Sequence, residues 1–132
     1  MADKLKFSLV SPERELYSGD VDQVDMPGTE GDLGILPNHS PLMAALSTGL
    51  ITVYKDGVED QYFVQGGFAD VTPAGLTILA ERSVHMDELD HDDLRSRIER
   101  AQKQVASLEG DAHVALSRDI DAMLRILGGK AA

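Results

Sequence analysis

The spacing of apolar residues changes once along the chain, near Met86, and this change limits the fold more than any other feature. Before it, apolar residues form short runs separated by turn-forming residues, as at 50–54, which Lys55-Asp56-Gly57 follows. Runs with turns every eight to twelve residues predict antiparallel strands in a sandwich or barrel. After Met86 the apolar residues recur at steps of three and four, which predicts helices. The sequence therefore predicts an α+β fold, with an antiparallel β-sandwich at 1–86 and a helical part at 87–132.

The helical part carries two apolar stripes. The first comprises Leu94, Ile98, Ala101, Val105 and Leu108, and the second comprises Leu116, Ile120, Met123 and Leu127. Acidic residues favour the positive end of a helix dipole, so the first helix should begin at Asp87 or Asp90. Gly110 interrupts the pattern, Asp111 can cap the second helix, and Gly128-Gly129 ends it. Two stripes joined by a short connection predict a C-terminal αα-hairpin.

The composition excludes several classes of protein. A formal net charge of −11 over 132 residues leaves no basic stripe for nucleic acid and disfavours adhesion to anionic lipid. The absence of cysteine excludes disulfides and thiol catalysis. No apolar run reaches the roughly 18 residues that a membrane-spanning helix needs. Residues 1–6 also lack the apolar core of a signal peptide.

A segment rich in glycine and proline, residues 27–42, is the strongest candidate for a functional site. Its glycines, Gly28, Gly31 and Gly34, could cradle a phosphate only if a Lys and a Ser or Thr followed them. No Lys or Arg lies between positions 14 and 55, and two acidic residues, Glu30 and Asp32, would repel a phosphate. The segment therefore does not predict a nucleotide site.

The same segment is better explained as a shaped protein surface. Glycine allows positive φ and close backbone approach, while proline fixes φ and extends the residue before it. We expect ordered turns and short strands that present Glu30 and His39 outward, as one docking loop from Glu30 to Leu42. His39 has no second histidine at ligand spacing, so no metal site is expected.

An enzymatic function has little support in the sequence. Glu30 with His39, or Asp70 with His85, could act as acid–base pairs. No nucleophile, metal cluster or polar pocket motif accompanies either pair, so we expect no active site. A free-standing β-sandwich that binds proteins, with a helical hairpin that dimerises it, remains an alternative.

The order of motifs over about residues 5–90 resembles the epsilon subunit of bacterial F-type ATP synthases, which is called delta in mitochondria. The most specific part is Gly34-Ile35-Leu36-Pro37-Asn38-His39-Ser40-Pro41-Leu42. The other matching residues are 10–13, 17–19, 28–33, Gly49, 66–68, Val71 and 76–80. The chain is therefore identified as a member of that family.

The resemblance implies a flattened β-sandwich of about ten strands, followed by two helices. It implies a non-catalytic rotor subunit of the central stalk, peripheral on the cytoplasmic face of the bacterial inner membrane, that couples rotation of the c ring to ATP synthesis. The implied partners are the gamma subunit, on a partly apolar patch of the sandwich, and the c-subunit ring. Glu30, Gly31, Gly34 and His39 would face the ring, with Glu30 paired to a basic side chain.

In many relatives the hairpin regulates ATP hydrolysis. The resemblance implies inhibitory contacts with the catalytic alpha and beta subunits, for which Arg95, Arg100, Arg118 and Arg125 are the candidates. Some relatives also bind ATP through Ile/Leu-Asp-x-x-Arg-Ala. This chain begins that motif with Leu89-Asp90 but has Asp93-Leu94 in place of Arg-Ala. Because a carboxylate at Asp93 would repel phosphates, we expect weak or no ATP binding and no cofactor.

Overall fold

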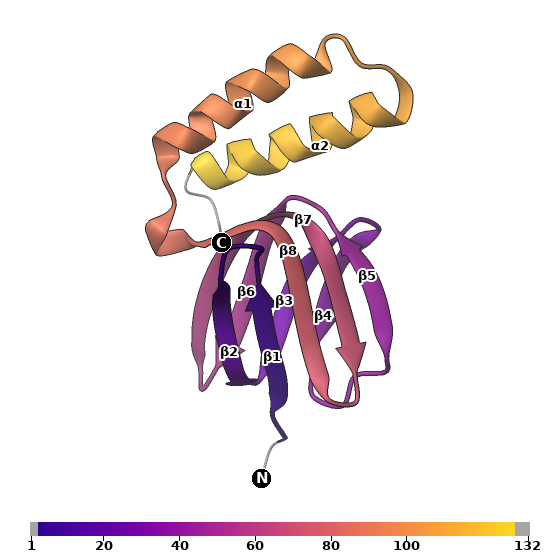
Figure 1. The fold of residues 1–132 in the computed structure, drawn as a ribbon, viewed down its shortest axis with the longest axis vertical. Helices are drawn as coiled ribbons and strands as arrows, with labels where there is room; N and C mark the ends of the chain where they lie inside the picture. The colour runs from indigo at the N-terminus through magenta and orange to yellow at the C-terminus, as the bar shows by residue number, and fades with distance from the viewer. Residues whose placement is uncertain (1–2, 129–132) are drawn as a thin grey trace. The chain divides into compact units, whose positions relative to one another are not determined.

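The computed structural model describes residues 3–128 and divides into two compact units, Met1–Asp87 and Glu88–Ala132 (Figure 1). The strands of the described residues all lie in the first unit, and both long helices lie in the second. The fold is therefore α+β, as the change of apolar spacing predicts.

The first unit is a β-sandwich, and residues 3–128 contain eight strands. They are β1 (Leu5–Val10), β2 (Glu15–Val21), β3 (Gln23–Gly28), β4 (Gly31–Ile35), β5 (Leu42–Leu46), β6 (Gly49–Lys55), β7 (Val58–Thr72) and β8 (Gly75–His85). The count is below the expected ten because β7 and β8 are long. The first half of β7 pairs with β6 and the second half pairs with β5, so this one strand takes positions that two shorter strands could fill.

β7 and β8 lie side by side and share an irregularity near their middle (Figure 1). Their pairing register skips Gly66 and Glu81. Gly66 and Gly67 have φ of 74° and 137°, a region that side chains other than glycine rarely adopt. A Cβ on Gly67 would lie 2.3 Å from the carbonyl oxygen of Leu79. Glycine is therefore required here both by the backbone angle and by the neighbouring strand.

The irregularity exchanges the two faces of β7. Before it, Tyr62 and Val64 are buried in the core; after it, Ala69 and Val71 are buried. Because side chains alternate along a strand, the buried set can move from even to odd positions only across a break in the ladder. This shift turns Phe68 to the outer face of the sheet, where it is exposed.

The strand order is β2-β1-β8-β7-β5-β3-β4, and β6 pairs with both β3 and β7. All of these pairs are antiparallel except β1 with β8, which is parallel and sets Phe7 opposite Leu76. The apolar pattern predicts only antiparallel strands, so this parallel pair differs from the prediction. Short turns join antiparallel neighbours, whereas a parallel pair needs a long connection, here supplied by the strands between β1 and β8.

One hydrophobic core fills the sandwich. Its buried members come from β1 to β8 and are Leu5, Phe7, Leu9, Val21, Val24, Met26, Ile35, Leu46, Ile51, Val53, Tyr62, Val64, Ala69, Val71, Leu76, Ile78 and Ala80. Because burial of apolar surface drives folding, a core drawn from every strand lets this unit hold its shape by itself.

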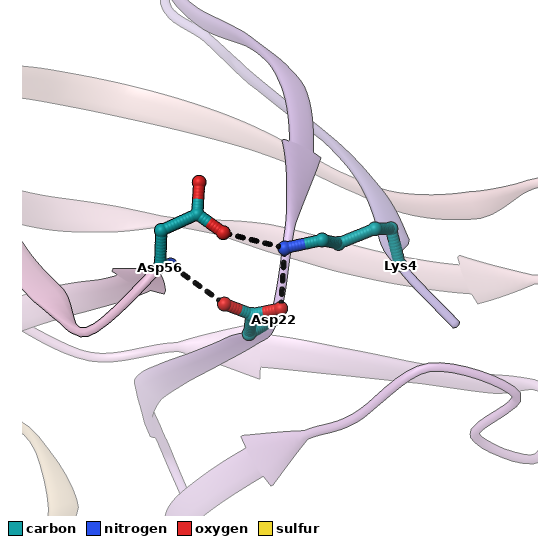
Figure 2. A network of polar contacts seen from close by, with 3 residues as sticks. All are labelled: Lys4, Asp22 and Asp56. Atoms are coloured by element: carbon teal, nitrogen blue, oxygen red, sulfur yellow. Dashed lines mark hydrogen bonds and ion pairs between the residues drawn. The ribbon is translucent and has the colours of Figure 1, made fainter. Parts of the chain in front are cut away.

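A charged network fixes the turn between β6 and β7 (Figure 2). Asp56 and Gly57 both have positive φ, 52° and 80°, as a two-residue hairpin turn between Lys55 and Val58 requires. The Lys4 ammonium lies 2.7 Å from Asp22 Oδ1 and 3.0 Å from Asp56 Oδ1. The Asp56 N–H donates to Asp22 Oδ2 at 2.7 Å. The network thus joins the start of β1, the β2–β3 corner and this turn.

The second unit is an αα-hairpin, as predicted. It contains α1 (His91–Val105) and α2 (Gly110–Leu127), which pack on each other, and the 3-10 turn η1 (Met86–Glu88) lies at the boundary between the two units. Asp90 caps α1, because its carboxylate accepts from the N–H groups of Asp92 and Asp93. The buried residues are Leu94, Ile98 and Ala101 in α1 and Ile120, Ala122, Met123 and Ile126 in α2.

The start of α2 differs from the prediction. Asp111 does not cap the helix; the N-cap is Glu109, which makes no side-chain cap hydrogen bond. Gly110, with φ of 63°, turns the chain into the helix before Asp111 is reached. Asp111 instead lies in the first turn, where its charge still suits the positive end of the helix dipole. Gly128 is the C-cap, as expected, and Gly129 lies outside the described residues.

Candidate partner-binding surfaces

Glu30 lies in a tight, exposed hairpin turn. Thr29 and Glu30 connect β3 to β4, and Gly28 faces Gly31 across the ladder. Gly31 has φ of 130°, and a Cβ on Gly28 would lie 2.5 Å from the Gly31 carbonyl oxygen. The Thr29 N–H also donates to the carbonyl of Ala45 at 3.0 Å. The glycines therefore allow a tight turn that presents the Glu30 side chain.

Gly34 has a different structural task. It faces Asp25 across the β3–β4 ladder, and a Cβ at Gly34 would lie 3.1 Å from Asp25 Oδ1. The Asp25 carboxylate accepts from Gln23 Nε2 at 2.6 Å and from the Tyr54 hydroxyl at 2.8 Å. The hydrogen bond to Asp25 raises the pKa of Tyr54, with burial adding to the effect. Gly34 leaves the space that this polar cluster occupies on the sheet surface.

His39 does not lie beside Glu30. The expected docking loop is interrupted by β4, and the Glu30 turn precedes this strand while His39 follows it, so the two side chains lie at its opposite ends. The His39 N–H donates to the Leu36 carbonyl at 3.2 Å. Its Nδ1 lies 2.7 Å from the Ser40 carbonyl oxygen, which can only accept, so Nδ1 carries the proton. The two residues are therefore candidates for two separate contacts.

An apolar surface lies on the outer face of the sheet formed by β5, β7 and β8. We call Met43, Phe68 and Leu79 the outer apolar face; they are 72%, 57% and 57% exposed. Phe68 faces Leu79 across the ladder, and Met43 lies on the same side of β5 as Ala45, which faces Phe68. The family resemblance implies only a partly apolar patch, without its residues. Leu79 could have been found, because it interrupts the polar positions of β8.

The arginine candidates of the hairpin are all exposed. They are Arg95, Arg100, Arg118 and Arg125. Arg95 forms an ion pair with Asp92 at 3.0 Å, and Asp93 forms one with Arg97 at 2.7 Å. Arg118 and Arg125 are seven residues apart, two helical turns, so they share one face of α2. The candidates therefore do not form one surface on a single helix.

The two imagined acid–base pairs are not present. Glu30 and His39 are separated by β4, and Asp70 lies beyond the irregularity in β7 from the part that faces His85. His85 instead contacts Asp60, with Nε2 at 2.5 Å from Oδ1. Within residues 3–128, no group of three or more His, Cys, Asp or Glu side chains could hold a metal ion. No described helix is long and apolar enough to cross a membrane.

The chain is an α+β protein with a β-sandwich unit and an αα-hairpin unit. Comparison with known sequences identifies the family. Residues 4–86 match the family described as the ATP synthase Delta/Epsilon chain, beta-sandwich domain. The chain belongs to the delta/epsilon chain family of ATP synthase.

Relatives and solved structures agree with this family. The ATP synthase epsilon chain of Maricaulis maris is 49% identical over 127 residues, covering 93% of this chain and 96% of that protein. The epsilon chain of Parvibaculum lavamentivorans is 53% identical over 112 residues, covering 84% and 85%. A chain of the Euglena gracilis mitochondrial ATP synthase (OSCP/F1/c-ring) matches with a TM-score of 0.70 at 24% identity, covering 95% of this chain and 78% of that one. A chain of the Tetrahymena thermophila central stalk and c-ring has a TM-score of 0.66 at 14% identity, covering 99% and 98%. These structures share the fold.

Proposed function

We propose that this chain is the non-catalytic rotor subunit of the central stalk of an F-type ATP synthase, where it couples rotation of the c ring to the catalytic core. Family membership over residues 4–86 is the observation that carries the proposal. The same residues present two exposed features suited to protein contacts, the outer apolar face and the Glu30 turn. Assembly would hold the chain on the cytoplasmic face of the bacterial inner membrane.

The outer apolar face is the proposed contact with the gamma subunit. Aromatic and large aliphatic side chains dominate binding energy when an interface buries them. Full burial of a side chain like Phe68 contributes roughly 1.5–3 kcal/mol, about a ten- to hundredfold change in affinity. An exposed Phe68→Glu substitution should leave the fold intact and remove this contribution, because a carboxylate would then have to be buried.

Gel filtration with purified gamma subunit tests this contact. The unmodified chain should co-migrate with gamma, and Phe68→Glu should not. Val58→Glu is the matched control, because Val58 is 66% exposed and lies at the far end of β7. Co-migration of Phe68→Glu would remove the outer apolar face from the interface. If the unmodified chain stays apart from gamma and runs as a dimer, the free-standing binding module with a dimerising hairpin replaces the rotor subunit.

The Glu30 turn is the proposed contact with the c-subunit ring. A carboxylate on a tight, exposed turn can pair with a basic side chain of a ring loop, which sets register and specificity more than affinity. Glu30→Lys should lower proton-driven ATP synthesis in membrane vesicles, whereas Glu59→Lys, the same charge change on β7, should not. Equal synthesis in both variants would remove Glu30 from the contact.

The other three candidates of the segment have separate roles in this proposal. Gly31 and Gly34 would act indirectly, by fixing the turn and by making room for Asp25. His39, beyond the far end of β4, would meet a different part of the ring or stalk. A double variant of Glu30 and His39 should lose the sum of the two single losses, since separated sites are additive. A marked departure from that sum would place them in one contact.

The hairpin is the proposed regulatory part. It would reach the catalytic alpha and beta subunits through Arg95, Arg100, Arg118 and Arg125. A chain truncated after Met86 keeps the whole sandwich core. Raised ATP hydrolysis in a complex reassembled with it would assign inhibition to the hairpin, whereas unchanged hydrolysis would make the hairpin structural.

Binding of ATP at the start of the hairpin should be weak. Asp90 already caps α1. Asp93 stands where the ATP-binding motif implied by the family resemblance has arginine. Calorimetric titration of the chain with ATP should show no micromolar binding; a micromolar dissociation constant would contradict this.

A further inference from the structure

His85 lies at the last residue of β8, directly before η1 and the boundary between the two units. Each ring nitrogen makes one hydrogen bond. Nε2 lies 2.5 Å from Asp60 Oδ1 on β7, and Nδ1 lies 3.1 Å from the backbone nitrogen of Asp87 in η1. The ring thus joins the end of the sandwich to the first turn of the chain that leads to the hairpin.

These two contacts fix the protonation state of the ring. A backbone N–H can only donate, so Nδ1 of His85 must accept the Asp87 N–H and carries no proton. A carboxylate accepts, so Nε2 carries the proton and donates it to Asp60. The arrangement requires the neutral imidazole with its proton on Nε2.

Protonation of the His85 ring would break its hydrogen bond with the Asp87 N–H and allow a new one with the Asp87 carboxylate. A proton added to Nδ1 would point at the Asp87 N–H, and two donors cannot share a hydrogen bond. The Asp87 carboxylate lies only 3.6 Å from Nδ1, and its side chain is 91% exposed, so it can turn to accept that proton. The bond from Nε2 to Asp60 would remain and gain the character of an ion pair.

The surroundings leave this exchange open to solvent. A hollow of about 530 Å³ beside His85 gives water access to the ring. The ring also stands edge-on to Tyr62, with centroids 4.9 Å apart. The other ionisable groups that line the hollow are Tyr17 from β2, Lys55 from β6, Asp56 from the turn, Glu59 and Asp60 from β7, and Asp87 from η1. Histidine is the residue type whose charge ordinarily changes between pH 5 and 8.

We propose that His85 is a pH-sensitive contact at the start of the connection between the two units: neutral, it holds the Asp87 N–H, and protonated, it releases that N–H and binds the Asp87 carboxylate. Acidification then loosens η1 while the core of the sandwich stays intact. The inference concerns this chain alone and does not depend on its assembly with other subunits.

NMR of the full chain tests the exchange. At pH 8 the nitrogen shifts of His85 should show Nε2 protonated and Nδ1 bare. Between pH 8 and 5 the protection of the Asp87 amide against solvent exchange should fall roughly three- to tenfold, the value of one net hydrogen bond. Protection of core amides such as that of Val64 should stay constant. A proton on Nδ1 at pH 8, or constant Asp87 protection, would overturn the proposal.

Two variants separate His85 from other groups. His85→Gln cannot titrate, so its Asp87 amide should show no change in protection between pH 8 and 5. His91→Gln removes the neighbouring exposed histidine at the first residue of α1 and should keep the full change. If the change survives in His85→Gln or disappears in His91→Gln, a group other than His85 controls the amide. If His85→Gln fails to fold, the His85 tautomer at pH 8 and the pH dependence of Asp87 amide protection in the unmodified chain still test the proposal.

Discussion

Replacement of Gly67 by alanine should destabilise the sandwich strongly, because two separate costs meet at this residue. Its φ of 137° is nearly restricted to glycine, and holding another residue there costs on the order of 1–3 kcal/mol. The new Cβ would also lie 2.3 Å from the Leu79 carbonyl oxygen and 2.8 Å from the Ala80 Cα, both backbone atoms that cannot rotate away. Overpacking of this kind costs about 1–3 kcal/mol more.

The combined loss for Gly67→Ala is about 4 kcal/mol, a large part of the roughly 5–15 kcal/mol that holds a typical domain folded. With a urea slope of about 2 kcal/mol per molar, the unfolding midpoint should fall by about 2 M. Tyrosine fluorescence can follow the transition, because the chain has no tryptophan and its three tyrosines, Tyr17, Tyr54 and Tyr62, all lie in strands of the sandwich.

Gly57→Ala is the matched control for this experiment. Gly57 also has positive φ, 80°, but a Cβ there would meet no atom within 4 Å. Its variant should therefore lose only the backbone cost, about 1–2 kcal/mol, and shift the midpoint by roughly 0.5–1 M. If Gly67→Ala is no less stable than Gly57→Ala, the close approach of β7 and β8 does not constrain this position and the reasoning fails.

Three further results are expected. Asp90→Ala should lower the free energy of unfolding of the hairpin by about 1 kcal/mol through loss of the α1 cap, measured as helical circular dichroism during urea unfolding; an unchanged midpoint would contradict the cap. The hydrogen bond from Lys4 lowers the pKa of Asp22, so the stabilisation from this carboxylate should be present above about pH 4 and be lost as pH falls toward the lower folded-state pKa. Asp22→Asn should remove this pH dependence from the unfolding midpoint. Persistence of the pH dependence in the variant would exclude Asp22 as its source. The hydroxyl of Tyr54 donates to Asp25, which raises the pKa of Tyr54, so the stabilisation should hold below about pH 10 and be lost above it. Asp25→Asn should return the phenol titration of Tyr54, read by ultraviolet absorbance, toward its ordinary range. An unmoved titration would refute the assignment.

Features set by neighbouring residues were predictable from the sequence. The cap at Asp90 requires only a short polar side chain followed by helix-forming residues, and the structure has it. The turn at Asp56 and Gly57 requires only residues that tolerate positive φ between two strands. The start of α2 shows the limit of the same reasoning, since Gly110 could turn the chain before Asp111. Where two adjacent residues both suit a helix start, the sequence does not determine which of them begins the helix.

Features set by distant residues were not predictable. Nothing in β1 indicates that it pairs in parallel with β8, because the partner lies at the other end of the sandwich sequence. The sequence predicts short strands within residues 27–42 but does not place β4 between Glu30 and His39, because β4 contains two glycines and an aspartate, residue types that are depleted in strands. The contact of His85 with Asp60 depends on the long pairing of β7 with β8, which places residues of two strands together.

The parallel pair of β1 with β8 also sets an order of events during folding. Phe7 cannot find its place opposite Leu76 until nearly the whole sandwich has been synthesised, so β1 must wait for β8. Pairing across so many residues carries a large loop-closure cost, and sheets of this kind fold slowly compared with helices. The hairpin α1–α2 follows the sandwich in the chain, and its two helices pack on each other across a short connection, so it should form quickly once synthesised. On the ribosome, the hairpin is therefore expected to finish folding before the sandwich, although it emerges after it.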